Sequence, residues 1–279
     1  MAINYRKFTR ADLDAAHRLS LAVGWPHRRE DWQFVLALGA GYVAVDAERV
    51  VGTILHWKYG KRHAALGMVI VEPESQGRGI GRELMSLALK DLEGSAIRLT
   101  ATPAGMPLYQ RLGFEAIGKI EQHQGLAHGG TIVAPARGER LRPIGRSDSR
   151  RLAALASRAS GMPRERVLSS LLEVADGIVL DRGGEPIGFA LMRRFGRGLA
   201  IGPVVAPDAK RAQILIAHWA AMNPRKFLRI DVHASQGLGP WLGRIGLKKV
   251  DTGVTMSKGP PPTQDAGLRD FALVNQALG

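Results

Sequence analysis

The chain of 279 residues contains no cysteine, and this absence excludes disulfides, thiolate metal sites and a cysteine nucleophile. Long apolar runs are also absent, since none approaches the roughly 18 to 20 residues that a membrane-spanning helix needs. The first residues carry charge, with Arg6, Lys7 and Arg10 where a secretory signal peptide would have its apolar stretch. We therefore expect a cytoplasmic protein with no membrane segment and no metal.

Charge is plentiful but uneven. Apolar residues make up 45% and charged residues 23% of the chain, which are the values of an ordinary folded protein. Residues 1–136 hold 16 basic against 13 acidic residues and the remainder holds 23 against 12, so the excess is +3 in the first half and +11 in the second. A basic second half either attracts anions such as nucleic acid, an acidic substrate or cofactor phosphates, or is a solvated arginine-rich surface. We favour the second interpretation.

Hydrophobic periodicity predicts the order β-α-α-β-β-β-α-β-α for the first half. A capping box at Thr9 and Asp12 marks the start of the first helix. The predicted strands span residues 3–8, 42–45, 50–57, 64–71 and 97–101, and the later predicted helices span residues 29–38, 79–92 and 107–112.

The second half repeats this order. Residues 179–189, 204–207 and 242–247 match residues 45–53, 70–73 and 109–114, in the same sequence and at an offset of roughly 133 to 136 residues. We therefore expect a first domain of residues 1–136, a second of residues 137–258, and a proline-rich spacer with a short C-terminal helix over residues 259–279. The stretch 122–140 contains the connection, and Leu268, Phe271 and Leu278 are expected to dock from the last helix.

A glycine-rich turn follows the strand that ends at Val71. It reads Gln76-Gly77-Arg78-Gly79-Ile80-Gly81 and opens a helix, so its free backbone amides and the helix dipole predict a phosphate or pyrophosphate site. A dinucleotide fingerprint would need glycine where Arg82 stands, and the Gly-Lys-Ser/Thr of a nucleotide P-loop is missing.

Two motifs together resemble the GNAT acetyltransferase superfamily. The turn of residues 76–81 satisfies the Gln/Arg-x-x-Gly-x-Gly/Ala motif of that family, and residues 107–114, Pro-Leu-Tyr-Gln-Arg-Leu-Gly-Phe, look like its second signature. The resemblance covers roughly residues 3–120, and the second half looks like the degenerate C-terminal domain of a tandem subfamily. It implies a mixed α/β (α+β) protein with two tandem GNAT folds, each a mostly antiparallel, splayed sheet flanked by helices.

The resemblance also implies cofactor contacts. Acetyl-CoA would be the acyl donor, with its pantetheine arm on the amides of Val69 and Val71 as though it were an added strand. The amide near Val69 would stabilise the oxyanion of the tetrahedral intermediate. Thr102 stands where the family usually has an asparagine that contacts the cofactor. The pyrophosphate would be held by Gln76, Gly77, Arg78, Gly79, Ile80, Gly81 and Arg82.

Tyr109 of the second signature would be the general acid that protonates the departing CoA thiolate. The general base is not assigned, because a surface or packing role is the simpler explanation for each candidate and a water chain could serve instead. The candidates are Glu72, Glu30, Asp31 and His56. Trp25, Trp32, Trp57 and Tyr59 lie in segments that form the acceptor wall in the family, although we favour ordinary core packing for each.

The second half lacks both signatures. It continues from Pro207 without a glycine, and Leu242 stands in the place of Tyr109. We therefore expect this half to support the first, by covering its acceptor cleft or contributing to it. Asp231 and His233 either face that cleft or form a satisfied strand pair, which is the simpler reading. The sequence favours acetyl transfer to a small primary amine, and the alternative is a non-catalytic acyl-CoA sensor whose basic half binds nucleic acid or an acidic partner.

Overall fold

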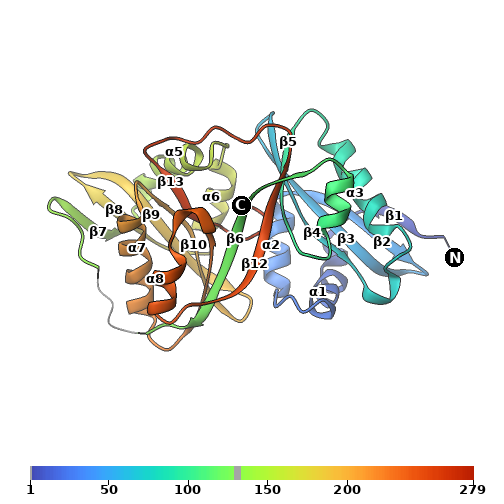
Figure 1. Cartoon of the computed structure of the whole chain (residues 1–279), viewed down its shortest axis with the longest axis horizontal. Coiled ribbons are helices and arrows are strands. Elements are labelled where there is room, and N and C mark those ends of the chain that lie inside the picture. The colour runs from blue at the N-terminus through green and yellow to red at the C-terminus, as the bar shows by residue number, and fades with distance from the viewer. Residues whose placement is uncertain (1, 129–132) are drawn as a thin grey trace.

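The computed structural model describes residues 2–128 and 133–279, and in it the chain forms two halves that lie side by side. Figure 1 shows the N-terminal half in blue and the C-terminal half in yellow and orange, with β6 and β12 crossing between them. Within the described residues one 13-stranded sheet runs through both halves, in the order β1-β2-β3-β4-β5-β12-β6-β11-β13-β10-β9-β8-β7. The mixed α/β architecture predicted from the sequence is confirmed.

The element order of the first half recurs in the second, which confirms the predicted repeat. The first half contains β1 (Asn4–Lys7), α1 (Leu13–Ala22), α2 (Arg29–Leu38), β2 (Ala40–Asp46), β3 (Arg49–Tyr59), β4 (His63–Val71), α3 (Ile80–Asp91), β5 (Ala96–Ala101), α4 (Met106–Arg111) and β6 (Glu115–Leu126). The second contains β7 (Glu139–Pro143), α5 (Ser149–Ser160), α6 (Glu165–Leu172), β8 (Asp176–Arg182), β9 (Glu185–Phe195), β10 (Gly198–Ala206), α7 (Ala209–Met222), β11 (Phe227–His233), α8 (Gly239–Arg244), β12 (Lys248–Lys258) and β13 (Arg269–Ala272).

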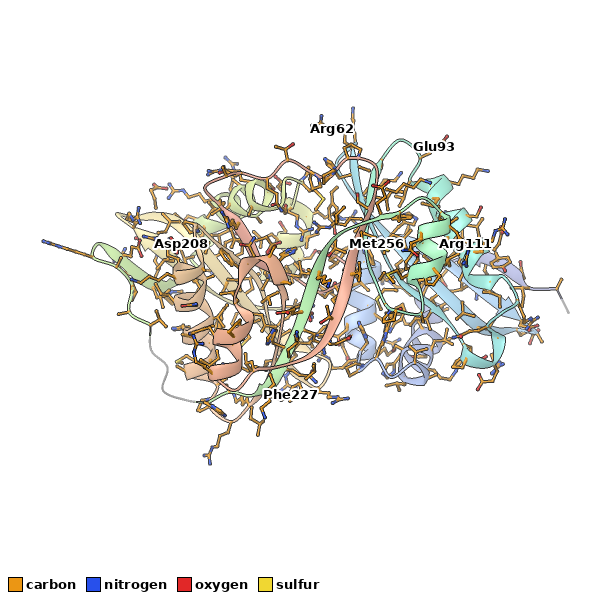
Figure 2. The ribbon with its side chains drawn as sticks, viewed as in Figure 1. Arg62, Glu93, Arg111, Asp208, Phe227 and Met256 are labelled. Atoms are coloured by element: carbon orange, nitrogen blue, oxygen red, sulfur yellow. The ribbon has the colours of Figure 1, made fainter. Side chains whose placement is uncertain are left out.

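The two halves exchange a strand. β12 comes from the second half of the sequence but pairs with β5, placing Val254 opposite Ala101, while β6 of the first half pairs with β11, placing His123 opposite Ile230. Met256 of β12, labelled near the centre of Figure 2, is fully buried in the core cluster of the first half. The sequence boundary near residue 136 therefore separates the repeats but not the spatial halves.

The stretch 122–140 contains the connection as expected, since β6 ends at Leu126 and β7 begins at Glu139, and its residues 129–132 lie outside the described residues. Another prediction near these strands is wrong. The expected C-terminal helix is a strand: β13 lies between β10 and β11, with Ala272 opposite both Val204 and Val232. Extended backbone supplies the hydrogen bonds that these two diverging strands need, whereas a helix could not. Leu268, Phe271 and Leu278 are buried, as expected.

A shared core joins the halves. Leu19 and Trp32 of α1 and α2 belong to the same buried cluster as Leu152 and Val167 of α5 and α6. The halves are thus held both by the continuous sheet and by helices that pack against each other across the junction. None of the helices among the described residues is long and apolar enough to cross a membrane.

We expect residues 1–128 expressed alone not to fold, because removing β12 exposes the backbone edges of β5 and β6 and opens the core at Met256. Co-expression with residues 133–279 should restore a soluble complex with a cooperative thermal transition by circular dichroism. A fragment of residues 1–128 that alone melts cooperatively near the temperature of the full chain would contradict the exchanged arrangement.

Candidate functional site

The site is built around a gap between β4 and β5. These parallel strands pair only where His63–Ala65 lies against residues 96–98. Past this point β4 stays with β3, through an irregularity opposite Thr53 and Leu55 at which Met68 has a positive φ of 54°. The Thr53 hydroxyl donates to the Met68 carbonyl at 2.8 Å and holds the bulge. β4 therefore has one open backbone edge.

Val69 and Val71 face that open edge with their amides. The Glu72 N–H donates to the Val51 carbonyl of β3 at 2.8 Å. Because successive N–H groups of a strand alternate in direction, those of Val71 and Val69 point away from β3 and into the gap. The Val71 carbonyl accepts a hydrogen bond from Gln76 Nε2 at 3.1 Å. The gap thus offers free donors to an extended ligand.

The glycine-rich turn sits at the end of the same strand. Gly77 and Gly79 have φ of 78° and 80°, which favours glycine, and a Cβ at either position would meet no atom within 4 Å. The first helical bond of α3 runs from the Glu83 amide to the Gly79 carbonyl. Among the described residues the six amides from Gly77 to Arg82 therefore have no hydrogen-bond acceptor, which makes the turn an anion site.

Side chains around the turn are mostly occupied elsewhere. Arg78 Nη1 lies 2.6 Å from the carboxylate of Asp46, the last residue of β2, and Ile80 is buried in the core. Gly81 lies where three elements converge, since a Cβ there would be 3.5 Å from Leu108 of α4 and 3.7 Å from Val71. The turn can therefore bind an anion through its backbone, with the exposed Arg82 beside it.

Tyr109 belongs to α4, and its ring lies against Gly105 at the start of that helix. Its side chain is buried, its ring packs edge-on against Phe114, and its hydroxyl makes no hydrogen bond within the described residues. A Cβ at Gly105 would be 3.2 Å from that hydroxyl. Burial raises the pKa of Tyr109 to about 12. Thr102 holds the same turn, since its hydroxyl accepts from the Gly105 amide at 3.2 Å.

A cavity of about 210 Å³ opens between the halves, next to the gap. The first half contributes the α1–α2 loop at residues 24–27, the β4 bulge at residues 67–68, and Thr100 and Thr102. The exchanged strands, the β9–β10 turn, β11 and the C-terminal segment complete the wall. The cavity therefore meets the open strand edge from the side opposite to the glycine turn.

Comparison with known proteins accounts for this arrangement. Models of an acetyltransferase (GNAT) domain match residues 33–129 and, separately, residues 152–268. The chain belongs to the GNAT acetyltransferase family. That family uses acetyl-CoA as the acyl donor, and two GNAT domains lie here in tandem.

Relatives of similar length support this assignment. The GNAT chain is 28% identical to YitH of Bacillus subtilis, described as an uncharacterized N-acetyltransferase, over 94% of this chain and 93% of that one. A candidate acetyltransferase of Pyrococcus horikoshii has the same fold, with a TM-score of 0.82 at 21% identity over 99% and 96% of the two chains. A tandem GNAT protein from the clavulanic acid biosynthesis pathway gives a TM-score of 0.66 at 14% identity over 93% and 99%.

The second GNAT domain has its corresponding gap filled. β10 and β11 occupy the places of β4 and β5, and β13 lies between them. Pro203, which has no N–H, stands at the position of Val69. At the start of α7 the Asp208 carboxylate accepts from the Arg211 amide at 2.9 Å, so the protein's own anion occupies this helix terminus. These three features explain why the repeat has no free counterpart of the first gap.

The structure separates the aromatic candidates for the acceptor wall. Trp25 lines the cavity. Trp32 and Trp57 are buried in the core, where Trp57 Nε1 donates to the Val35 carbonyl, and the Tyr59 hydroxyl donates to the Leu278 carbonyl at 2.6 Å. Core packing is thus the correct reading for three of the four.

The four candidate bases lie outside the cavity wall. Glu72 is paired with Arg49, Asp31 with Arg28, and His56 with Asp91, and Glu30 is exposed on α2. Asp231 is held by Arg229, so its side-chain partner on this strand is Arg229 and not His233.

The cavity instead brings together residues that the sequence did not single out. His27, Arg229 and Asp251 line it, from the α1–α2 loop, β11 and β12. Arg229 and Asp251 lie there because β6 pairs with both β11 and β12. No local sequence motif predicts this pairing.

We expect Gly79→Glu to abolish acetyl-CoA binding, because it places a carboxylate among the free amides of the turn. Gly94→Glu is a matched control: Gly94 also has a positive φ, of 79°, and open space around it, but follows α3 at its other end. Both variants should lose similar stability, and isothermal titration should show binding lost only in the first. Equal affinity in the two variants would remove the turn from the cofactor site.

We also expect stability to fall in mild acid. Burial, with a contribution from Arg98, lowers the pKa of His233 to about 4, below its ordinary value of 6.5. As the pH falls, the unfolded chain therefore protonates His233 before the folded chain does. The stability that depends on neutral His233 is fully present above pH 6.5 and is lost as the pH falls toward 4. The loss in unfolding free energy is about 3 kcal/mol. In urea titrations, His233→Gln should flatten the pH dependence of the unfolding free energy in this window, and an unchanged slope would contradict the assignment.

Proposed function

We propose that this acetyltransferase transfers acetyl from acetyl-CoA to a primary amine of a small molecule, by direct attack within a ternary complex. The observation that carries the proposal is the meeting of the cavity with the open edge of β4 at Gly67 and Met68. The acyl donor enters the gap from the glycine turn and the acceptor from the cavity. Two substrates held in this way react with the advantage of orientation alone.

The position of the cavity between the two halves favours a small acceptor. Its walls come from both halves and from the C-terminal segment, and its volume is about 210 Å³. A protein substrate would have to bring an extended chain to the bulge at Met68. An amine of metabolite size can reach it without any movement of the two halves.

The chain's own residues supply two contributions to the chemistry. The Val69 amide, directed into the gap, donates to the thioester carbonyl oxygen and stabilises the negative charge that develops there. Tyr109 donates to the departing sulfur. The amine nitrogen loses a proton as the new amide bond forms and the sulfur gains one, so the products are an N-acetyl compound and a free thiol.

The raised pKa of Tyr109 defines how it acts. With a pKa of about 12 the phenol keeps its proton throughout the ordinary pH range. A thiol has a pKa of about 8.5, so complete transfer from the phenol to the thiolate is uphill until the phenolate is reprotonated. The proton released by the attacking nitrogen restores it, and Tyr109 then works as a relay as well as an acid.

The alternative of a nucleic-acid-binding sensor gains no support from the basic half. Several of its arginines are engaged within the protein: Arg142 pairs with Asp148 at 2.6 Å, Arg158 with Asp265 at 2.7 Å, and Arg211 with Glu139 at 2.6 Å.

We expect Tyr109→Phe to lower kcat by about 100-fold or more while leaving acetyl-CoA binding nearly unchanged, because only the proton donor is removed. Release of free CoA can be followed with a thiol reagent, since the protein has no cysteine to react. The wild-type kcat should show no alkaline decline from this group below about pH 11, because its pKa is raised to about 12.

Tyr42→Phe provides the control, since it makes the same change on β2 at a hydroxyl engaged with Lys7 and Asp91. It should leave kcat unchanged. An unaltered kcat in Tyr109→Phe, with binding intact, would show that the thiolate leaves without help from this residue.

A further inference from the structure

The second half of the chain supplies one charged side chain that is fixed and aimed at the cavity. Arg229 of β11 is buried, with 9% of its surface exposed, and lines the cavity wall. Its Nε and Nη2 donate to the Asp231 carboxylate at 3.1 and 2.9 Å. These bonds hold the guanidinium in one orientation, so that its remaining nitrogen has a defined direction.

That remaining nitrogen, Nη1, donates to no acceptor within the described residues. Phe195 packs against the guanidinium, with the Arg229 Cζ 5.1 Å from the ring centre, and also lines the cavity. Nη1 is not among the fully buried polar atoms, so it can reach a ligand, and a charge-assisted hydrogen bond from it to an anion would be strong. Arginine presents its donors in a planar fork that matches a carboxylate.

The field at this end of the cavity favours an anion. His27 lies opposite, its ring edge-on to Phe195 at 5.2 Å, and its buried Nδ1 has no hydrogen-bond partner among the described residues. Burial lowers the pKa of His27 to about 4, and Arg229 is the next largest cause, ahead of the opposing effect of Asp31. The positive charge of Arg229 is therefore felt in the cavity despite its pairing with Asp231.

The other side of the cavity carries the opposite sign. Asp251 of β12 lines it and lies opposite Gln122 of β6, which lies opposite Asp231 of β11. β6 lies between β12 and β11, so two strand spacings, roughly 10 Å, separate Asp251 from strand β11, which contains Arg229. Arg197, exposed in the β9–β10 turn, lines the cavity as well and forms no ion pair within the described residues. A ligand with one anionic and one cationic group suits both ends.

From this arrangement we propose that the acceptor is an amino acid or a close derivative, whose carboxylate binds Arg229 at the inner end of the cavity while its amine faces the bulge at Met68. The proposal rests on the acetyl transfer proposed above and names its substrate class. Arg197 assists capture of the carboxylate at the rim, and Asp251 attracts the ammonium before it loses its proton. Arg229 thus makes the second, cofactor-free half the source of acceptor specificity.

The experiment compares each standard amino acid with its own amide as acceptor, in the full-length protein, by CoA release with saturating acetyl-CoA. The amide lacks the carboxylate, and its amine is intrinsically more reactive at neutral pH. The readout is therefore the ratio of kcat/KM for acid to amide, compared between wild type and variant, because intrinsic reactivity cancels in this comparison. Arg229→Gln should lower this acid-to-amide ratio by about 10- to 100-fold relative to wild type.

Two further variants keep this test interpretable. Arg62→Gln removes the same charge from the outer β3–β4 turn (Figure 2) and should leave the ratio unchanged. Because Arg229→Gln leaves the buried Asp231 without its partner, the double variant Arg229→Gln with Asp231→Asn is measured beside it. Melting temperatures show whether the single variant, the double variant or both are folded. Each folded variant must show the lowered acid-to-amide ratio.

A second readout is independent of turnover. In the presence of CoA, wild type should bind an N-acetyl amino acid at least about 10-fold more tightly than the corresponding N-acetyl amide, and the Arg229 variant should lose this preference. Carboxylate-dependent binding without turnover of any amine would support the recognition and overturn the acetyl transfer. Turnover of amines with equal ratios in wild type and Arg229 variant would overturn the recognition and leave the acetyl transfer standing. Neither binding nor turnover would overturn both.

Discussion

The pairing of β6 with β12 is the interaction on which the rest of the structure depends. Each strand ends the repeat to which it belongs in sequence, and each lies in the other half in space. Their contact runs from Lys248 opposite Gln124 to Ser257 opposite Glu115. Because backbone hydrogen bonds cross the junction along this length, the halves have a fixed orientation, and a cavity between them has walls as rigid as those within one domain.

The two halves differ in how they treat the gap between their diverging parallel strands. Where parallel strands diverge, the backbone groups at the facing edges lack partners, and leaving them buried and unpaired is costly. Between β10 and β11 the chain fills the gap with its own strand, β13. Between β4 and β5 the gap stays open, and the free amides at Val69 and Val71 are retained for an extended ligand. The placement of the last strand therefore decides which of the two halves has an open backbone edge.

The sequence predicts most of what is local. The glycine turn, its helix, the strand before it and the second signature at Tyr109 all depend on residues close together in the chain, and their patterns have a direct physical meaning. The offset of the repeat predicts the second fold for the same reason. The sequence predicts a helix where β13 lies, because apolar spacing alone does not reveal the diverging strands that pair with residues 269–272.

The acceptor wall could not be predicted, because it depends on pairing between distant segments. Arg229 and Asp251 reach one face only through the exchanged strands, and Gly67 lies against Ala277 at the other end of the sequence. Trp25 and Trp32 look equivalent in sequence, yet the first lines the cavity and the second is buried in the core. What decides between them is which side of the α1–α2 loop the second half covers.

The C-terminal segment links the filled gap of the second half to the cavity wall. After β13 fills the gap of the second half, the chain continues onto the first, where Asn275 accepts from the amides of Ala277 and Leu278. The Leu278 carbonyl accepts from the Tyr59 hydroxyl of β3 and from Arg164 beside α6, so one backbone group ties both halves together. Between these anchors Gln276 lines the cavity and donates to Asp231 at 3.3 Å, the carboxylate that orients Arg229. The strand that fills the gap of the second half thereby continues into the wall of the cavity between the halves.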